Sequence, residues 1–167
     1  FYDPKDLEEI IKKGASKLKV PIDKDSIVEI AKRARGTPRI ALKLLKRARD
    51  FVQVKGDGKL IHNLIKESLD LLEVDEVGLD SSDARYLKAI IQKHGGGPVG
   101  IETIAATISE DIGTIEEVIE PYLMQIGFLK KTSRGRVATG AAYHHLKIAL
   151  PAGRQDLPKS TKQEKLI

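Results

Sequence analysis

Apolar residues recur at helical spacing along most of this chain, in short runs that glycine and proline separate. The first run follows Asp3-Pro4, in which the aspartate can cap a helix and the proline can fill the first helical position. Thr37-Pro38 repeats this start signal directly after Gly36, a natural stop, and a last run covers residues 61–72. The pattern predicts four amphipathic helices packed as a bundle in residues 1–74.

The acidic segment 73–80 lacks this periodicity, and we place a domain boundary there. Helical spacing returns in residues 86–91 and 99–108, and a capping box at residues 114–117 predicts the start of a third helix. Pro121 lies inside this helix, where its missing N–H is expected to bend the helix or to end its first segment. The second half therefore begins as three short helices.

A β-hairpin is predicted after these helices, from residues 127–129 through a basic turn at 133–135 to residues 137–139. Three helices followed by a hairpin is the order of a winged helix. We therefore expect a mainly α chain, in which the four-helix bundle is followed by a winged helix-turn-helix with a small β-hairpin wing in residues 75–150. The composition of residues 151–167 predicts a disordered tail.

The composition excludes several classes of protein. The chain has no cysteine, which excludes disulfides, thiolate metal sites and cysteine nucleophiles. It has no apolar run long enough to cross a bilayer and no secretory signal at its start, so we expect a cytoplasmic protein with no membrane partner. The net charge of +5 modestly favours a polyanionic partner, which makes the distribution of the charge important.

Arg39 lies in the first turn of the predicted third helix, where a cation is unusual. Because the helix macrodipole is positive at this end, a cation there costs about 0.3–1 kcal/mol unless an anion compensates it. A phosphate would do so, since helix N-termini bind such groups. The alternative is that Arg39 pairs with Asp6 or Asp23 or points to solvent, and spacing alone favours this alternative. A solvated basic helix face is the simpler interpretation for most of the cations around it, which are Arg33, Lys43, Lys46, Arg47 and Arg49.

Residues 130–136 place four cations at the predicted wing. A hairpin tip holds such side chains where they can reach the phosphates or the minor groove of DNA. A loop that merely keeps the edge soluble is the less favoured alternative, because like charges at this density repel one another. The preceding helix is acidic, and no Lys or Arg lies between Glu102 and Lys130. We therefore predict that the wing, and not the helix, makes the main DNA contact, largely without sequence specificity.

Other candidate sites are weak. The four histidines have no spacing with carboxylates that indicates a metal site; they are His62, His94, His144 and His145. The glycine-rich segment 95–100 is not followed by Lys-Ser or Lys-Thr, so it is not a Walker A loop, and it is better interpreted as a helix stop and a close-packed turn. We expect no metal site and no catalytic residues in this chain.

Five segments resemble, in the same order, segments of the RuvB family of AAA+ ATPases, and the match covers nearly the whole chain before the tail. They are residues 33–41 (RARGTPRIA), 96–100 (GGPVG), 120–123 (EPYL), 127–129 (GFL) and 132–136 (TSRGR). The resemblance implies that the bundle is an AAA+ small (lid) domain and the second half a winged-helix DNA-binding domain.

The resemblance also implies roles for particular residues. Arg39 matches the sensor-2 arginine that contacts ATP phosphates, and Tyr2 matches a tyrosine beside the nucleotide. Lys131 and Arg136 match positions that contact DNA, and Arg134 is a third candidate contact. Lys131 replaces an arginine that is usual in the family, which keeps the charge but loses the planar, bidentate fork.

For a full-length protein, the resemblance implies an ATP-dependent DNA helicase or translocase that drives branch migration of Holliday junctions in recombination and repair. Its cofactors would be ATP and Mg²⁺, and its partners the duplex arms of the junction, the junction-binding protein RuvA and further copies of itself in a hexamer. The Walker A, Walker B, sensor-1 and arginine-finger segments are expected in an ATPase domain before Phe1. We expect the present chain alone to bind no nucleotide and to lack ATPase activity.

Two other functions stay open at this point. One is a winged-helix transcription regulator with a helical effector or dimerisation domain, which would need a recognition helix able to read bases. The other is an initiator-type AAA+ loader, which shares the order of lid and winged helix.

Overall fold

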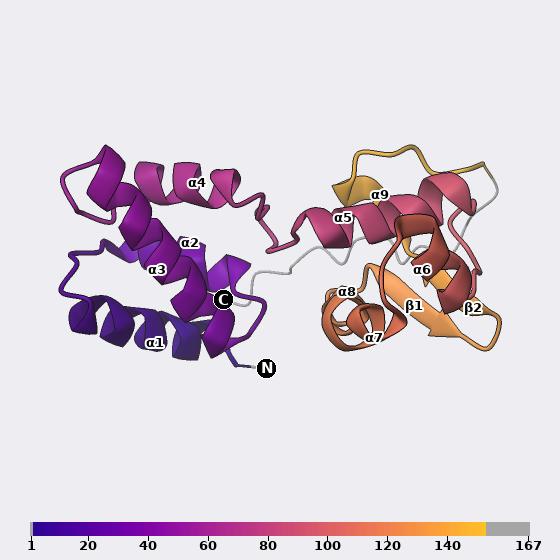
Figure 1. The fold of residues 1–167 in the computed structure, drawn as a ribbon, viewed down its shortest axis with the longest axis horizontal. Helices are drawn as coiled ribbons and strands as arrows, with labels where there is room; N and C mark the ends of the chain where they lie inside the picture. Colours follow the sequence, from indigo (N-terminus) through magenta and orange to yellow (C-terminus); the bar gives the residue numbers. More distant parts are fainter. Residues whose placement is uncertain (1, 153–167) are drawn as a thin grey trace, which may run out of the picture. The chain divides into compact units, whose positions relative to one another are not determined.

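The computed structural model describes residues 2–152 of the 167-residue chain, and the chain forms two compact units that divide between Ser81 and Ser82 (Figure 1). The predicted tail lies, except for residues 151 and 152, outside the described residues. The boundary at residue 74 stays a prediction. The observed division lies seven residues later, because the segment that follows residue 74 folds back onto the first unit.

The first unit is the expected bundle of four helices. They are α1 (Pro4–Lys17), α2 (Lys24–Arg33), α3 (Pro38–Lys55) and α4 (His62–Leu71). Helix α3 packs against both α1 and α4, as Figure 1 shows. The apolar stripe of each helix points into one shared core, which includes Leu7, Ile11, Ile30, Leu45, Val52 and Ile65. Burial of these stripes stabilises helices that would be marginal alone.

The start signals of α1 and α3 are both confirmed, but they differ in chemistry. Asp3 caps α1 by accepting a hydrogen bond from the Lys5 N–H at 2.9 Å. Thr37 occupies the N-cap position of α3 but makes no side-chain cap, because its hydroxyl donates to the Arg35 carbonyl at 3.2 Å. The N-terminal N–H groups of α3 therefore have no side-chain cap from Thr37, which matters for the site below.

The second unit consists of short helices followed by one hairpin. Its helical segments are α5 (Ser81–Lys88), η1 (Ala89–Lys93), α6 (Ile101–Ile108), α7 (Ile112–Thr114), η2 (Ile115–Ile119), α8 (Glu120–Gln125) and α9 (Gly140–His145). The hairpin pairs β1 (Leu129–Thr132) with β2 (Gly135–Ala138) in antiparallel register. The prediction of a mainly α chain with a small β-hairpin wing is confirmed.

The helix that contains Pro121 departs from the predicted form in two ways. It begins three residues early, because Asp111 accepts a hydrogen bond from the Thr114 N–H at 3.0 Å, so the predicted capping box of Thr114 and Glu117 is wrong. It also changes register before the proline. The Glu120 N–H donates to the Ile115 carbonyl five residues back, and residues Ile115–Ile119 form a π-helical turn. This register change precedes the proline, which has no N–H of its own to donate.

A third strand segment, which the sequence analysis missed, holds the wing. Val99 pairs with Arg136 of β2 through two backbone hydrogen bonds of 3.1 and 2.8 Å. Gly97 has a φ of +88°, and a Cβ on it would clash with the Arg136 carbonyl oxygen. The glycine-rich segment is therefore the close-packed turn that was predicted, and its partner is the wing.

Candidate functional site

The hairpin presents two cations directly opposite each other. Lys131 of β1 is in register with Arg136 of β2, and Thr132 with Gly135. The Thr132 hydroxyl donates to the Gly135 carbonyl at 2.9 Å and accepts from the Arg134 N–H at 3.3 Å, which closes the turn. Lys131 and Arg134 are exposed, whereas Arg136 is 8% exposed. The wing therefore carries one buried and several exposed cations.

Arg136 is held by a carboxylate from the helix behind the wing. Its Nε donates to Glu120 Oε1 at 2.7 Å and its Nη2 donates to Glu120 Oε2 at 3.2 Å, a bidentate pair. The Tyr86 hydroxyl donates to the same Oε1 at 2.6 Å. The hydrogen bond to Glu120 raises the pKa of Arg136, and burial together with the Glu120 hydrogen bond raises the pKa of Tyr86 well above its usual range. At neutral pH Arg136 is therefore a charged guanidinium and Tyr86 a neutral phenol.

Glu116 faces both opposed cations of the wing. One of its oxygens lies 3.2 Å from Arg136 Nη2 and 3.5 Å from Lys131 Nζ. The acidic helix was expected only to repel DNA; in the structure two of its acids are partners of the wing. Sequence reasoning missed these pairs because they join residues 15 to 20 positions apart, although the four-residue spacing of Glu116 and Glu120 places both on one helix face.

Two cations of the wing have no acidic partner. Within residues 2–152, Lys130 and Arg134 form no ion pair, and both side chains are exposed. Arg134 lies in the two-residue turn of the hairpin, at its tip. These are the positions from which a cation reaches an external anion without first breaking an internal pair.

Arg39 lies in the first turn of α3, as predicted, and its side chain is exposed. It forms no ion pair within the described part of the chain, so the suggested pairing with Asp6 or Asp23 is wrong. The carboxylate of Asp23 instead caps α2 and also accepts from the His62 N–H at 3.2 Å. No acid lies in the first turn of α3. An anion at this helix start would therefore meet no competing carboxylate from that turn.

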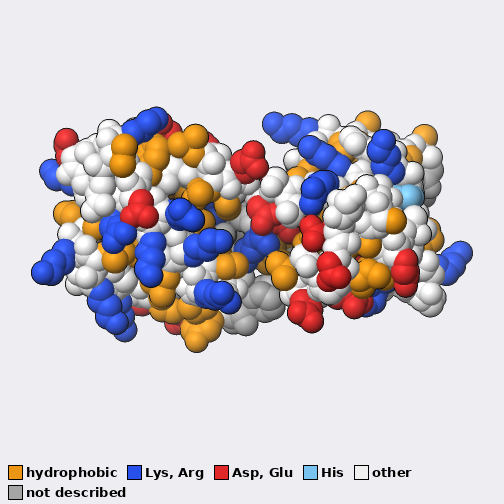
Figure 2. Space-filling view, viewed as in Figure 1, with side chains coloured by type: hydrophobic (Ala, Val, Ile, Leu, Met, Phe, Trp, Pro, Cys, Tyr) orange, Lys and Arg blue, Asp and Glu red, His pale blue; other side chains and the backbone are white. Residues whose placement is uncertain are grey.

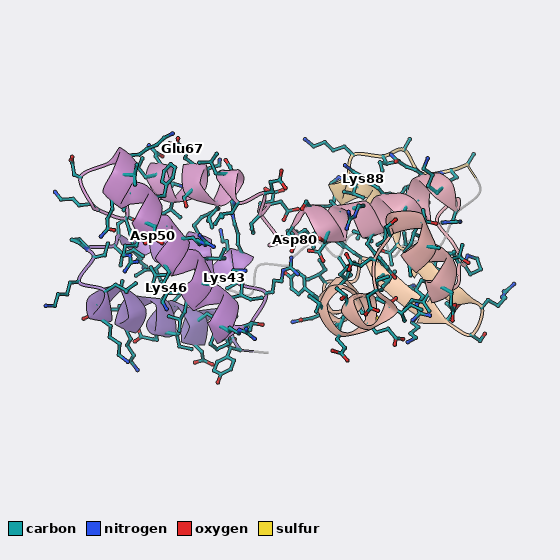
Figure 3. The ribbon with its side chains drawn as sticks, viewed as in Figure 1. Lys43, Lys46, Asp50, Glu67, Asp80 and Lys88 are labelled. Carbon is teal, nitrogen blue, oxygen red and sulfur yellow. The ribbon has the colours of Figure 1, made fainter. Side chains whose placement is uncertain are left out.

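The exposed face of α3 continues the positive charge of Arg39. An open groove runs along it, lined by Arg39, Leu42, Lys43, Lys46, Arg47 and Asp50. Figure 2 shows Lys and Arg side chains gathered on one face of the first unit, and Figure 3 labels Lys43, Lys46 and Asp50 along the helix. The solvated basic face predicted for the cations near Arg39 is present here.

Tyr2 lies at the same end of α3. Its N–H donates to the Gly36 carbonyl at 2.8 Å, which places residue 2 beside the turn between α2 and α3. The Tyr2 side chain is 53% exposed. The structure thus brings the two residues expected near a nucleotide, Tyr2 and Arg39, to the same turn of the bundle.

Arg33 departs from the interpretation as a solvated cation. It is 3% exposed, and its Nη2 lies 2.7 Å from Glu29 while its Nη1 donates to the Val74 carbonyl at 2.6 Å. Arg35 similarly donates from Nε to the Gly78 carbonyl at 2.7 Å. These two arginines bind the segment that follows α4, so their roles are structural.

No group of histidines and acids in residues 2–152 has the geometry to hold a metal ion. No helix in that same range is both long and apolar enough to span a membrane.

Comparisons with known proteins agree with the two-part fold. The model of the RuvB AAA lid domain matches residues 2–75, and that of the RuvB C-terminal winged helix domain matches residues 76–147. The Holliday junction branch migration complex subunit RuvB of Anaeromyxobacter sp. (strain K) is 52% identical over 155 residues, as is that of Anaeromyxobacter dehalogenans (strain 2CP-1). Each alignment covers 93% of this chain and 45% of the relative.

Solved structures give the same result. The Thermotoga maritima RuvB Holliday junction branch migration motor has a TM-score of 0.86 and 46% identity, covering 90% of this chain and 51% of that one. A point mutant of T. maritima RuvB has a TM-score of 0.87 and 45% identity, with 90% and 50% covered. The chain spans about half the length of the relatives it matches. Two adjoining family models and these alignments show that the chain belongs to the RuvB family, of which it carries the lid and the carboxy-terminal winged helix.

Proposed function

We propose that this chain is the carboxy-terminal part of an ATP-dependent motor that drives branch migration of Holliday junctions, in which the lid senses nucleotide and the wing binds duplex DNA. The relatives named above are branch-migration subunits or motors. The observation that carries the proposal is the display of exposed cations at two places, the first turn of α3 and the tip of the hairpin. Both places suit phosphate groups.

On the DNA side, Arg134 and Lys131 contact backbone phosphates, and Arg136 completes the contact from its fixed position against Glu120. Phosphate contacts position a protein on a duplex without reading bases, which suits a motor that must move along DNA. The acidic helix before the wing argues against a transcription regulator, because Glu117 and Asp111 are exposed where a recognition helix would need to approach the major groove.

On the nucleotide side, Arg39 contacts ATP phosphates, and Tyr2 lies beside the nucleotide. The site fits an anion, because the first turn of α3 is uncapped by Thr37 and contains no acid. ATP with Mg²⁺ supplies the driving reaction in the full-length protein, while the groups that hydrolyse it belong to an ATPase domain. We propose that the present chain alone has no ATPase activity, and that the full-length motor is a cytoplasmic hexamer that works with RuvA.

Duplex binding by the 167-residue chain tests the DNA role. Arg134→Ala and Lys131→Ala are expected to weaken binding in a fluorescence anisotropy titration. Each is also expected to reduce the slope of log affinity against log salt concentration by about one. Lys88→Ala is the matched control, because it removes one exposed cation from α5, outside the hairpin. Comparison of a four-way junction, plain duplex and origin-like sequences separates a branch-migration motor from an initiator-type loader. Equal weakening by the control would contradict a wing-centred contact.

ATP turnover by a full-length protein tests the lid. Arg39→Ala is expected to impair turnover and to leave duplex binding by the winged helix nearly unchanged. Lys43→Ala, one turn further along the same face, serves as the control for a general loss of positive charge. Equal loss of turnover and duplex binding in Arg39→Ala would argue against separate roles for the two units.

A further inference from the structure

Lys131 and Arg136 form a pair of like charges across the hairpin, and of the two only Arg136 has a buried acidic partner, Glu120. They lie directly opposite each other in the antiparallel register, where side chains approach within about 4.5–5.5 Å at Cβ and like charges destabilise the pairing. One oxygen of Glu116 faces both, at 3.5 Å from Lys131 Nζ and 3.2 Å from Arg136 Nη2, and it supplements the buried Glu120 carboxylate that already pairs with Arg136. The pair and its carboxylate thus form a three-charge site on the surface of the wing.

The members of this site differ in how firmly they are held. Arg136 is anchored by Glu120, whose side chain is 2% exposed, at 2.7 Å. Glu116 is 47% exposed and Lys131 is 51% exposed, and their contact is longer. Exposed ion pairs contribute little free energy to stability. A competing anion can therefore replace Glu116, while Arg136 keeps its orientation against Glu120.

A backbone phosphate has the chemistry to take the place of Glu116. Like a carboxylate, it offers two anionic oxygens, and guanidinium and ammonium groups donate strong hydrogen bonds to it. We infer that the Glu116 carboxylate occupies, in the free chain, the site where a duplex phosphate binds between Lys131 and Arg136, and so limits the affinity of the wing for DNA. This inference rests on the proposed function of the wing as a DNA contact.

Neighbouring Glu117 provides a matched control for this role. It is also exposed and lies in the same π-helical turn, but within residues 2–152 it forms no ion pair with the wing. Replacing either glutamate with glutamine keeps the side-chain size and changes the net charge equally. A difference between the two variants therefore reports the local contact and not the overall charge of the chain.

The test is fluorescence anisotropy of a labelled duplex of mixed sequence with the 167-residue chain, at several salt concentrations. Glu116→Gln is expected to bind about two- to fivefold more tightly than Glu117→Gln, the range that corresponds to loss of an exposed ion pair. Equal affinities of the two variants, or weaker binding by Glu116→Gln, would overturn the inference. Circular dichroism melting of both variants checks that each stays folded.

Two further variants separate this inference from the proposed function. Combined with Lys131→Met, Glu116→Gln is expected to give a smaller gain, because the site has lost one of its cations. A full gain in that background would assign the effect elsewhere. If Arg134→Ala weakens binding while the two glutamine variants bind equally, the wing still contacts DNA and only the role of Glu116 is wrong. If Arg134→Ala binds as tightly as the parent chain, the proposed DNA contact itself is wrong.

Discussion

Glu120 joins three elements of the second unit, and its replacement by leucine is expected to destabilise that unit strongly. The carboxylate accepts from Tyr86 of α5 and from Arg136 of β2, and it is 1% exposed. Glu120→Leu leaves the guanidinium with only Glu116 and leaves the buried Tyr86 hydroxyl without its acceptor. The wing then loses its main side-chain attachment to the helices.

The expected cost follows from these contacts. Breaking a buried ion pair by removing one partner costs about 3–5 kcal/mol. Arg136 keeps the contact to Glu116, which favours the lower end of that range. The orphaned hydroxyl of Tyr86, which is 0% exposed, adds about 1–3 kcal/mol. We expect a total loss of about 4–6 kcal/mol, a large fraction of the stability of a small domain.

Urea unfolding followed by circular dichroism measures this loss, and hydrogen exchange resolved by peptide assigns it to the second unit, with the lid as internal reference. The triple variant Tyr86→Phe, Glu120→Leu, Arg136→Met replaces every charge and hydroxyl of the cluster by an apolar group. It is expected to recover at least half of the loss, because no polar group remains buried without a partner. A cost below about 1 kcal/mol for Glu120→Leu, or a triple variant no more stable than the single one, would refute the reasoning.

Three smaller predictions concern pH and backbone geometry. Folding raises the pKa of Tyr86, so the folded chain favours the neutral phenol. This contribution to stability is fully present below the unfolded pKa of about 10 and is lost as the pH rises above that value. Between pH 8 and 10.5, the free energy of unfolding should therefore fall by about 0.8 kcal/mol more in the parent chain than in Tyr86→Phe. Burial would raise the pKa of Asp23, but hydrogen bonds from Ser26 and His62 lower this pKa overall. In urea unfolding, Asp23→Ala should reduce the free energy of unfolding by about 0.5–2 kcal/mol at pH 7, and by less as the pH falls below 4. Gly135→Ala should speed hydrogen exchange of the hairpin more than Gly127→Ala does. Both glycines have a positive φ, but only a Cβ at Gly135 would clash with the Val99 carbonyl. Equal effects of the two substitutions would contradict this reasoning.

Local sequence predicted the helices well where one signal acted alone. Asp3-Pro4 starts α1 because the cap and the proline act within a single turn. The predicted helix start at Thr114 was wrong because two candidate caps lie three residues apart. The helix begins at the carboxylate of Asp111 and not at the hydroxyl of Thr114. The intrinsic N-cap preference, in which aspartate ranks above threonine, agrees with Asp111, so the capping-box match of Thr114 and Glu117 was the weaker of the two signals.

The candidate site was predictable in its composition and not in its pairing. Charge density alone placed cations at the wing, and the exposed side chains of Lys131 and Arg134 agree with that pattern. Which of the cations is buried depends on where β2 meets α8, a contact between residues 16 positions apart. The strand segment at Val99 was also missed, because a single bridging residue has no periodicity of its own that a sequence pattern could reveal.

The attachment of the segment after α4 has a consequence for how this region tolerates mutation. Arg33 and Arg35 hold this segment by hydrogen bonds to the main-chain carbonyls of Val74 and Gly78, and a main-chain carbonyl is a group that every amino acid possesses. These two acceptors do not depend on side-chain identity, but other contacts of the segment do: Asp75 accepts from the N–H groups of Val77 and Leu79, and Asp80 lies 3.3 Å from Arg35. Inserting or deleting one residue between Val74 and Gly78 would change the spacing of the two carbonyls, so that both arginines could no longer reach their acceptors. Gly78 cannot be replaced for a different reason, because its φ of +84° and its closeness to the Arg33 backbone admit no larger residue.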